Sequence, residues 1–258
     1  MVERTSYTEG TPSWVDLGTP DIEAARRFYG DLFGWDFEGL GEMAGHYTNC
    51  LRDGLPVAAM APQQDPADPP RWTTYFASDD ADRTAARITE AGGRLAMDPM
   101  DVFDQGRMLI AFDPAGAPFG IWQAKAHTGA RRVNEHGAII WNELHTRDTA
   151  PEDDFYRSVF GYSQEKLGDG VAFDYSLYKV GDNLIGGRNR LGTDDTTPPG
   201  WLTYFGVDDT DAAVASATAG GATVLTPARD SEYGRMAVLA DPWGAVFAVI
   251  EVPEEETS

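Results

Sequence analysis

Hydrophobic positions along the chain follow two periods, one typical of helices and one typical of strands. Residues 19–34 read TPDIEAARRFYGDLFG, and their apolar side chains recur every three or four residues, so they fall on one face of a helix. Thr19 is expected to cap this helix, with Pro20 at its first position and Gly34 at its exit. Residues 79–93, DDADRTAARITEAGG, predict a second helix, and SWVDLGT, just before the first helix, alternates as strands do.

The same series of elements occurs twice. WTTYF, which begins at Trp72, matches WLTYF at Trp201, and DPAGAPF at Asp113 matches DPWGAVF at Asp241, with offsets of 129 and 128 residues. Ordered matches at nearly constant spacing indicate an internal repeat. Each copy contains two βαβββ units, so we expect an α+β fold with four such units in all.

The repeat also predicts the domain organisation. The first module is expected over residues 1–124 and the second over 138–252, joined by a linker at 125–137 and followed by an acidic tail at 253–258. Because one chain supplies both modules, a monomer is sufficient, and a homodimer stays open.

Composition narrows the possible partners. The net charge is −22 and no basic stripe is present, which argues against a nucleic-acid partner because a polyanion would be repelled. No apolar run reaches the roughly 18 residues of a membrane span, so no membrane partner is expected, and a cytoplasmic location follows. The single cysteine, Cys50, excludes an intrachain disulfide and a cysteine-rich zinc site, and it is expected to be a small buried residue.

Four motifs carry a resemblance to a known family: the strand before DIEAARRFY, the FY-x3-FGW helix end, the DD-helix-AGG segment and DPxGAxF before the last strand. In this order they resemble the vicinal oxygen chelate superfamily, which includes glyoxalase I, extradiol dioxygenases and bleomycin-resistance proteins. The two-module actinobacterial members, described as hydroxylase-like or glyoxalase-like, are the most similar. The resemblance implies that paired βαβββ units curl into a cup with helices outside and the ligand or metal inside. One such scaffold hosts lyases, oxygenases and pure binding proteins.

The resemblance also implies where the metal ligands of the family's enzymes would fall. The corresponding positions are Trp14 and Trp141 on the first strand, Gly120 and Ala248 on the last, and positions near Ala59, Gly186, Thr73 and Thr203. None of these side chains is a strong ligand, whereas a catalytic metal needs two or three converging histidines or carboxylates. We therefore expect no metal and no other cofactor, with a divalent metal as the alternative.

Strand alternation predicts which other side chains face the cups. If Trp14 points inward, so does Asp16, and if Trp141 points inward, so do Glu143 and His145. On the last strand of the first module, Phe119 and Ile121 are expected to face the helices, and Gly120 and Trp122 the cup. The predicted ligand-binding residues are Trp14, Tyr75, Gly120, Trp122, Trp141, Tyr204 and Ala248.

These residues predict a pocket with indole side chains on its walls and small side chains at its base, which suits a flat organic molecule. The prediction is metal-independent binding of a small aromatic or cationic molecule, of the resistance or biosynthesis-accessory type. The alternative is a glyoxalase-like lyase, an oxygenase or a hydroxylase with a non-standard metal or acid–base cluster of Asp16, Glu143 and His145. That cluster requires the two cups to share an interface.

Structural roles remain open for the same residues. The indoles can simply fill the cups, and Asp16 and Glu143 can cap a loop or pair with Arg188 or Arg190. His46, His127 and His136 are expected near the surface or in structural bonds. Arg107 and Arg235, in the repeated GRM blocks, are expected in a turn or an ion pair with a nearby carboxylate.

Overall fold

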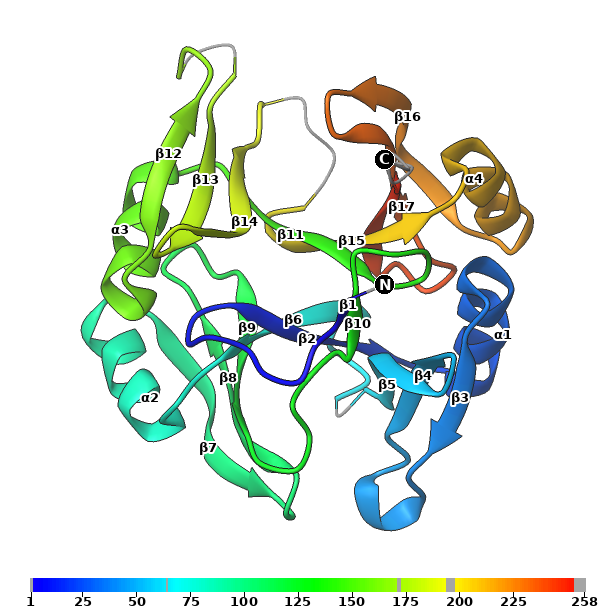
Figure 1. Ribbon diagram of the computed structural model, residues 1–258, viewed down its shortest axis with the longest axis horizontal. Coiled ribbons are helices and arrows are strands. Elements are labelled where there is room, and N and C mark those ends of the chain that lie inside the picture. Colours follow the sequence, from blue (N-terminus) through cyan, green and yellow to red (C-terminus); the bar gives the residue numbers. More distant parts are fainter. Residues whose placement is uncertain (1, 64, 171–172, 194–197, 253–258) are drawn as a thin grey trace.

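The computed structural model describes residues 2–63, 65–170, 173–193 and 198–252, so the predicted acidic tail lies outside the described residues. The chain forms two curled mixed sheets, one from each module (Figure 1). In Figure 1 the first sheet, blue to green, lies below the second, green to red. The predicted α+β fold of tandem βαβββ modules is confirmed.

The first sheet has the strand order β3-β4-β5-β2-β6-β9-β8-β7. Its strands are β2 (Pro12–Thr19), β3 (Asp36–Gly39), β4 (Thr48–Arg52), β5 (Leu55–Pro62), β6 (Arg71–Ala77), β7 (Arg94–Val102), β8 (Gly106–Phe112) and β9 (Pro118–Ala124). The central neighbours β2 and β6 are antiparallel, whereas β2–β5 and β6–β9 are parallel. Each half of the sheet is therefore one βαβββ unit.

The second sheet repeats this order as β12-β13-β14-β11-β15-β18-β17-β16. Its strands are β11 (Ile139–Thr146), β12 (Ser163–Leu167), β13 (Tyr175–Val180), β14 (Asn183–Arg190), β15 (Gly200–Val207), β16 (Thr223–Ser231), β17 (Gly234–Ala240) and β18 (Val246–Glu251). Two short strands, β1 (Val2–Glu3) and β10 (Arg132–Val133), pair with each other, and β10 also pairs with β11. The predicted linker thus contributes a strand to the second sheet.

The helices are α1 (Ile22–Phe33), α2 (Ala81–Glu90), α3 (Thr149–Phe160) and α4 (Thr210–Ala219), with a short 3-10 helix, η1 (Glu42–Ala44). The first of them begins later than predicted. Asp21, not Thr19, is the N-cap, because its carboxylate accepts the backbone N–H of Ala24, and Pro20 precedes the cap. Gly34 ends the helix in the left-handed conformation, as predicted.

The helices lie outside each cup, and they also join the two modules. In Figure 1, α1 lies beside α4 on one side of the molecule and α2 beside α3 on the other. Phe33 of α1 packs against Phe205 and Phe247 of the second module. On the opposite side, Phe119 packs against α3, so its predicted helix-facing direction holds. Because both large hydrophobic clusters contain side chains from both modules, the modules share their cores.

Strand register aligns the predicted cup residues in rows. Trp14 on β2 is opposite Tyr75 on β6, and Tyr75 is opposite Gly120 on β9. The second sheet repeats this row with Trp141, Tyr204 and Ala248. Side chains directly opposite one another on neighbouring strands share a face, so each row lies on one side of its sheet.

Candidate functional site

In the cup of the first sheet, a carboxylate is held by two tyrosines. The hydroxyls of Tyr47 and Tyr75 donate hydrogen bonds to Asp16 Oδ2 over 3.2 Å and 3.0 Å. Trp14 Nε1 donates to the Tyr47 hydroxyl over 2.8 Å, which completes a chain from indole to acid. Burial raises the pKa of Asp16 to about 6, and the tyrosine hydrogen bonds oppose that rise.

Small residues in this cup make room for the protein's own rings. A Cβ on Gly120 would lie 2.1 Å from the ring of Tyr75, and a Cβ on Gly106 would lie 2.3 Å from that of Trp122. The space at Gly120, which the sequence assigned to a ligand, is therefore occupied by Tyr75.

A histidine of the linker packs into the same cup. His127 lies edge-on to Trp14, with ring centroids 4.5 Å apart, and 5.6 Å from Trp122, whose indole N–H donates to the His127 carbonyl. Burial lowers the pKa of His127 to about 4, so the ring between the two indoles is neutral at pH 7. Sequence reasoning placed His127 near the surface or in a structural bond and did not connect it with the indoles.

The cup of the second sheet contains the same arrangement with glutamate in place of aspartate. Tyr175 and Tyr204 donate to Glu143 Oε2 and Oε1 over 2.7 Å and 3.2 Å, and Trp141 Nε1 donates to the Tyr175 hydroxyl over 3.1 Å. A Cβ on Gly187 would lie 2.1 Å from the Tyr175 hydroxyl, so a small residue again accommodates a tyrosine.

Tyr47 and Tyr175 were missed at the sequence level. They are 128 residues apart, which is the offset of the other repeated motifs, and each is followed by a hydroxyl residue, in YT and YS. This repeat spacing is the feature of the sequence from which both tyrosines could have been predicted. Because each tyrosine stands at or just before the start of a strand, alternation along the central strands did not point to it.

One histidine distinguishes the second cup from the first. His145 Nε2 lies 2.5 Å from Glu143 Oε1, and the ring is 4% exposed. The repeat-related position in the first module is Gly18, 127 residues earlier. Within the described part of the chain, His145 Nδ1 is buried and has no hydrogen-bond partner.

The two modules meet back to back, so the predicted three-residue cluster does not form. Thr74 and Thr203 both donate to Asn142 Oδ1, over 3.1 Å and 3.0 Å, at the interface between the sheets. These residues alternate with the cup residues on their strands, so the two cups open away from each other (Figure 1). Asp16 therefore lies in one cup, and Glu143 and His145 lie in the other.

The side chains at the metal-ligand positions do not match the ligands of the family's enzymes. At the corresponding strand positions the cups present indole, glycine and alanine, and Thr203 faces the module interface. Among the described residues, no group of three or more His, Cys, Asp or Glu side chains is placed to hold a metal ion.

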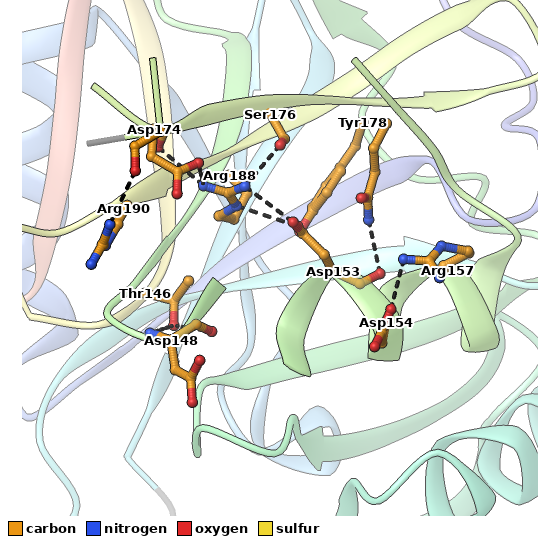
Figure 2. Close-up of polar contacts among 12 residues, drawn as sticks. Thr146, Asp148, Asp153, Asp154, Arg157, Asp174, Ser176, Tyr178, Arg188 and Arg190 are labelled. Carbon is orange, nitrogen blue, oxygen red and sulfur yellow. Dashed lines mark hydrogen bonds and ion pairs between the residues drawn. The ribbon is translucent and has the colours of Figure 1, made fainter. Parts of the chain in front are cut away.

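Arg188, one of the two arginines considered as a partner of Glu143, forms ion pairs elsewhere. Arg188, 1% exposed, pairs with Asp153 on α3 and Asp174 beside β13 over 3.0 Å and 2.6 Å (Figure 2). It does not pair with Glu143, so of the structural alternatives the Glu143–Arg188 pair is not formed. In the two GRM blocks, each arginine pairs with an aspartate of the adjacent helix, as predicted: Arg107 with Asp82 and Arg235 with Asp211.

A cleft of about 490 Å³ is lined in part by Trp141, a residue of the second cup. Its lining includes Tyr7 and Thr8 of the N-terminal segment, Ile140 and Trp141 of β11, and Leu184 of β14. Trp141 thus belongs both to the cleft and to the chain of hydrogen bonds that ends at Glu143.

At the repeat-related position of the first module, the linker crosses the sheet. There the backbone N–H groups of Ala130 and Arg131 donate to the carbonyls of Ser13 and Pro56, which bridges β2 and β5. Ser13 and Pro56 correspond to Ile140 and Leu184, which line the cleft. The two modules therefore differ at this position, because the linker crosses it in the first module and the cleft lies there in the second.

Comparisons with known proteins agree with the architecture. The family model of the Glyoxalase/Bleomycin resistance protein/Dioxygenase superfamily matches residues 11–121, and that of the Glyoxalase-like domain matches residues 141–250. The chain belongs to this superfamily.

Individual relatives cover nearly the whole chain. It is 40% identical over 257 residues to the "Putative glyoxylase CFP32" of Mycobacterium tuberculosis, which spans 97% of this chain and 98% of the relative. It is 37% identical over 265 residues to the anthracycline biosynthesis protein DnrV of Streptomyces peucetius, which spans 97% of this chain and 96% of the relative. Among solved structures, the Mn(II)-bound glyoxalase of Novosphingobium aromaticivorans superposes with a TM-score of 0.66 at 19% identity, covering 96% of this chain and 84% of that one. At that identity the likeness concerns the fold alone.

Across the described residues, no helix combines the length and the apolar composition that crossing a bilayer requires.

Proposed function

We propose that this protein binds a small, flat organic molecule, aromatic or cationic, beside Trp141 without using a catalytic metal ion. The observation that carries the proposal is the position of Trp141, which lines a cleft of about 490 Å³ and is hydrogen-bonded into the Glu143 network. A volume of this size lies within the range of about 300–1,000 Å³ that is typical of small-molecule sites.

The chemistry of the lining supports this ligand class. An indole offers a large apolar face for stacking, and it attracts cations through the quadrupole of its ring. The net charge of −22 raises the local concentration of cationic molecules and lowers that of anionic ones. Asn134 and Asn183 in the cleft lining supply amide groups that can orient a ligand by hydrogen bonds.

The proposal also states that ligand binding requires no metal ion. It is supported by the donor set, because indole, glycine and alanine stand where the family's metal enzymes carry ligands. The relative named as an anthracycline biosynthesis protein supports a binding role of the biosynthesis-accessory type. No reaction step is required for such a role.

The test combines ligand binding with elemental analysis. Neutral, cationic and anionic aromatic metabolites are titrated into the protein, with tryptophan fluorescence and calorimetry as readouts. We expect saturable binding of neutral or cationic members with the metal content below stoichiometric. Trp141→Leu should weaken binding about tenfold, equivalent to about 1.4 kcal/mol.

Trp243→Leu is the matched control, because Trp243 packs against Phe28 at the module interface and does not line the cleft. Equal losses in the two variants would place the ligand elsewhere. Flat titrations across the panel with folded protein would falsify the binding proposal. Stoichiometric Zn, Ni, Fe or Mn with thiol-dependent turnover of methylglyoxal would replace it with the metal-enzyme alternative.

A further inference from the structure

The Glu143–His145 pair is a buried dyad that binding at Trp141 does not explain. Glu143 is 7% exposed and His145 is 4% exposed, and both side chains lie on the cup face of β11. The first module contains the acid and both tyrosines of this network but has Gly18 in place of the histidine. The dyad is therefore a specific addition to the second cup.

The hydrogen bonds around Glu143 fix the positions of the protons. Trp141 Nε1 is only a donor, so the Tyr175 oxygen accepts its proton and the Tyr175 hydroxyl proton is directed at Glu143. Tyr204 donates to the same carboxylate. The carboxyl group of Glu143 is therefore the acceptor in both of these bonds.

One tautomer of the histidine matches these proton positions. With Glu143 as the acceptor in this contact too, His145 Nε2 carries the hydrogen that bridges the 2.5 Å to Glu143 Oε1. In the neutral ring, Nδ1 then has a free lone pair. This atom is buried and has no partner among the described residues. An unsatisfied buried acceptor costs about 1–3 kcal/mol, so a hydrogen-bond donor beyond the described residues would stabilise this atom.

We infer that His145 Nδ1 accepts the hydroxyl proton of a bound phenol or enol, and that Glu143 and His145 together form a general base. The inference rests on the proposed function, because it requires a ligand that enters the second cup. In the step, the O–H bond of the ligand breaks, an N–H bond forms at Nδ1, and the electron pair stays on the ligand oxygen. The imidazolium is stabilised by the adjacent carboxylate through Nε2–H, and the proton returns when the ligand leaves.

The ligand class follows from this geometry. A lone pair at Nδ1 selects a group that donates a hydrogen bond, and the adjacent aromatic side chains select a planar molecule. A phenol or an enol of a conjugated ring system meets both conditions. An ether of the same ring system has the shape without the donor, so it is the natural comparison.

The test uses 7-hydroxy-4-methylcoumarin, whose absorbance changes when its hydroxyl ionises, and its 7-methoxy analogue. Both are titrated into the wild-type chain and into His145→Gln, with EDTA present. We expect the bound hydroxycoumarin to ionise at least tenfold more readily than the free probe in the wild type. In His145→Gln it should remain neutral, and the methoxy analogue should bind at least tenfold more weakly than the hydroxycoumarin to the wild type.

His136→Gln is the matched control, because it removes a histidine that is only partly buried and lies against Asp208 rather than in a cup. It should ionise the probe as the wild type does. A second measurement uses only the wild-type protein, so it does not depend on whether a variant folds. In the wild type, long-range ¹H–¹⁵N spectra should show His145 protonated only at Nε2, with the Nδ1 resonance shifting when the hydroxycoumarin is added.

The outcomes separate this inference from the proposed function. Equal ionisation in wild type and His145→Gln, an Nδ1 resonance that does not move, or no binding of the hydroxycoumarin overturns the proton-transfer inference. If other aromatic or cationic ligands still bind and depend on Trp141, the proposed function stands. If nothing in the panel binds, both fail.

Discussion

Tyr29 in the first module donates a hydrogen bond to Asp241 in the second, over 3.0 Å and across 212 residues of sequence. The reciprocal bond joins Tyr156 to Asp113, also over 3.0 Å. Each tyrosine comes from an FY motif at the end of a first helix, and each aspartate opens a DPxGAxF motif. Two repeated motifs that looked independent in the sequence therefore bind each other across the module interface.

Removal of the Tyr29 hydroxyl should destabilise the whole chain. The hydroxyl also accepts the indole N–H of Trp72 over 3.0 Å, so Tyr29→Phe leaves two buried polar partners without it. We expect a loss of about 1–3 kcal/mol in the free energy of unfolding, measured by urea denaturation. Tyr233→Phe is the control, because Tyr233 is 56% exposed. Equal stability of the two variants would contradict a structural role for the Tyr29–Asp241 bond.

Gly120→Ala should disrupt the first cup. The added methyl would lie 2.1 Å from the Tyr75 ring, so that ring must move and its bond to Asp16 must lengthen. Overpacking of this kind costs about 1–3 kcal/mol, which thermal unfolding can measure. Gly18→Ala tests the same substitution where the nearest atom, on Gln63, is 4.0 Å away. If Gly18→Ala were the more damaging variant, the packing argument would be wrong.

Glu152 should make stability depend on pH. Burial, together with the neighbouring Asp113, raises the pKa of Glu152 from 4.5 to about 9. The folded chain then keeps a proton that the unfolded chain releases above pH 4.5, so stability falls as the pH rises from 4.5 toward about 9. Glu152→Gln cannot ionise, and its stability relative to the wild type should increase across this window.

Urea denaturation at several pH values within that window measures the difference. Glu42→Gln, at an exposed position of η1, should show no such trend. A stability difference between Glu152→Gln and the wild type that stays constant with pH would show that Glu152 ionises normally in the folded protein.

The buried ion pairs of Arg188 should be among the most sensitive contacts of the second module. Arg188→Leu leaves Asp153 and Asp174 without their cationic partner (Figure 2). Breaking a buried pair from one side costs about 3–5 kcal/mol, because an uncompensated charge remains. Arg235→Leu removes a surface pair and should cost much less. Comparable losses in the two variants, measured by denaturation, would argue against this ranking.

Much of the fold and part of the site could be predicted from local patterns. The period-two alternation correctly placed Trp14 and Asp16, and Trp141, Glu143 and His145, on common faces. The repeat predicted both modules because similar sequences bury similar faces. The N-cap prediction failed at Thr19 because three nearby residues, Thr19, Pro20 and Asp21, are all compatible with a helix start, and only the bond to Ala24 decides between them.

The rest depended on contacts between distant segments. Sequence alone could not show that Tyr75 fills the space over Gly120, because cross-strand register determines that contact. It could not place His127 between two indoles, because the path of a linker depends on the surfaces that it joins.

By itself, the sequence determined that the chain contains four βαβββ units, that its cups present indoles and carboxylates, and that the family's metal-ligand positions carry other residues. Only the tertiary structure decided that the cups open in opposite directions, that the linker packs against the indoles of the first, and that Trp141 of the second lines a cleft. The physical reason is that alternation along a strand is a local property of the backbone. The packing of one module on the other depends on side chains more than a hundred residues apart, such as Tyr29 and Asp241.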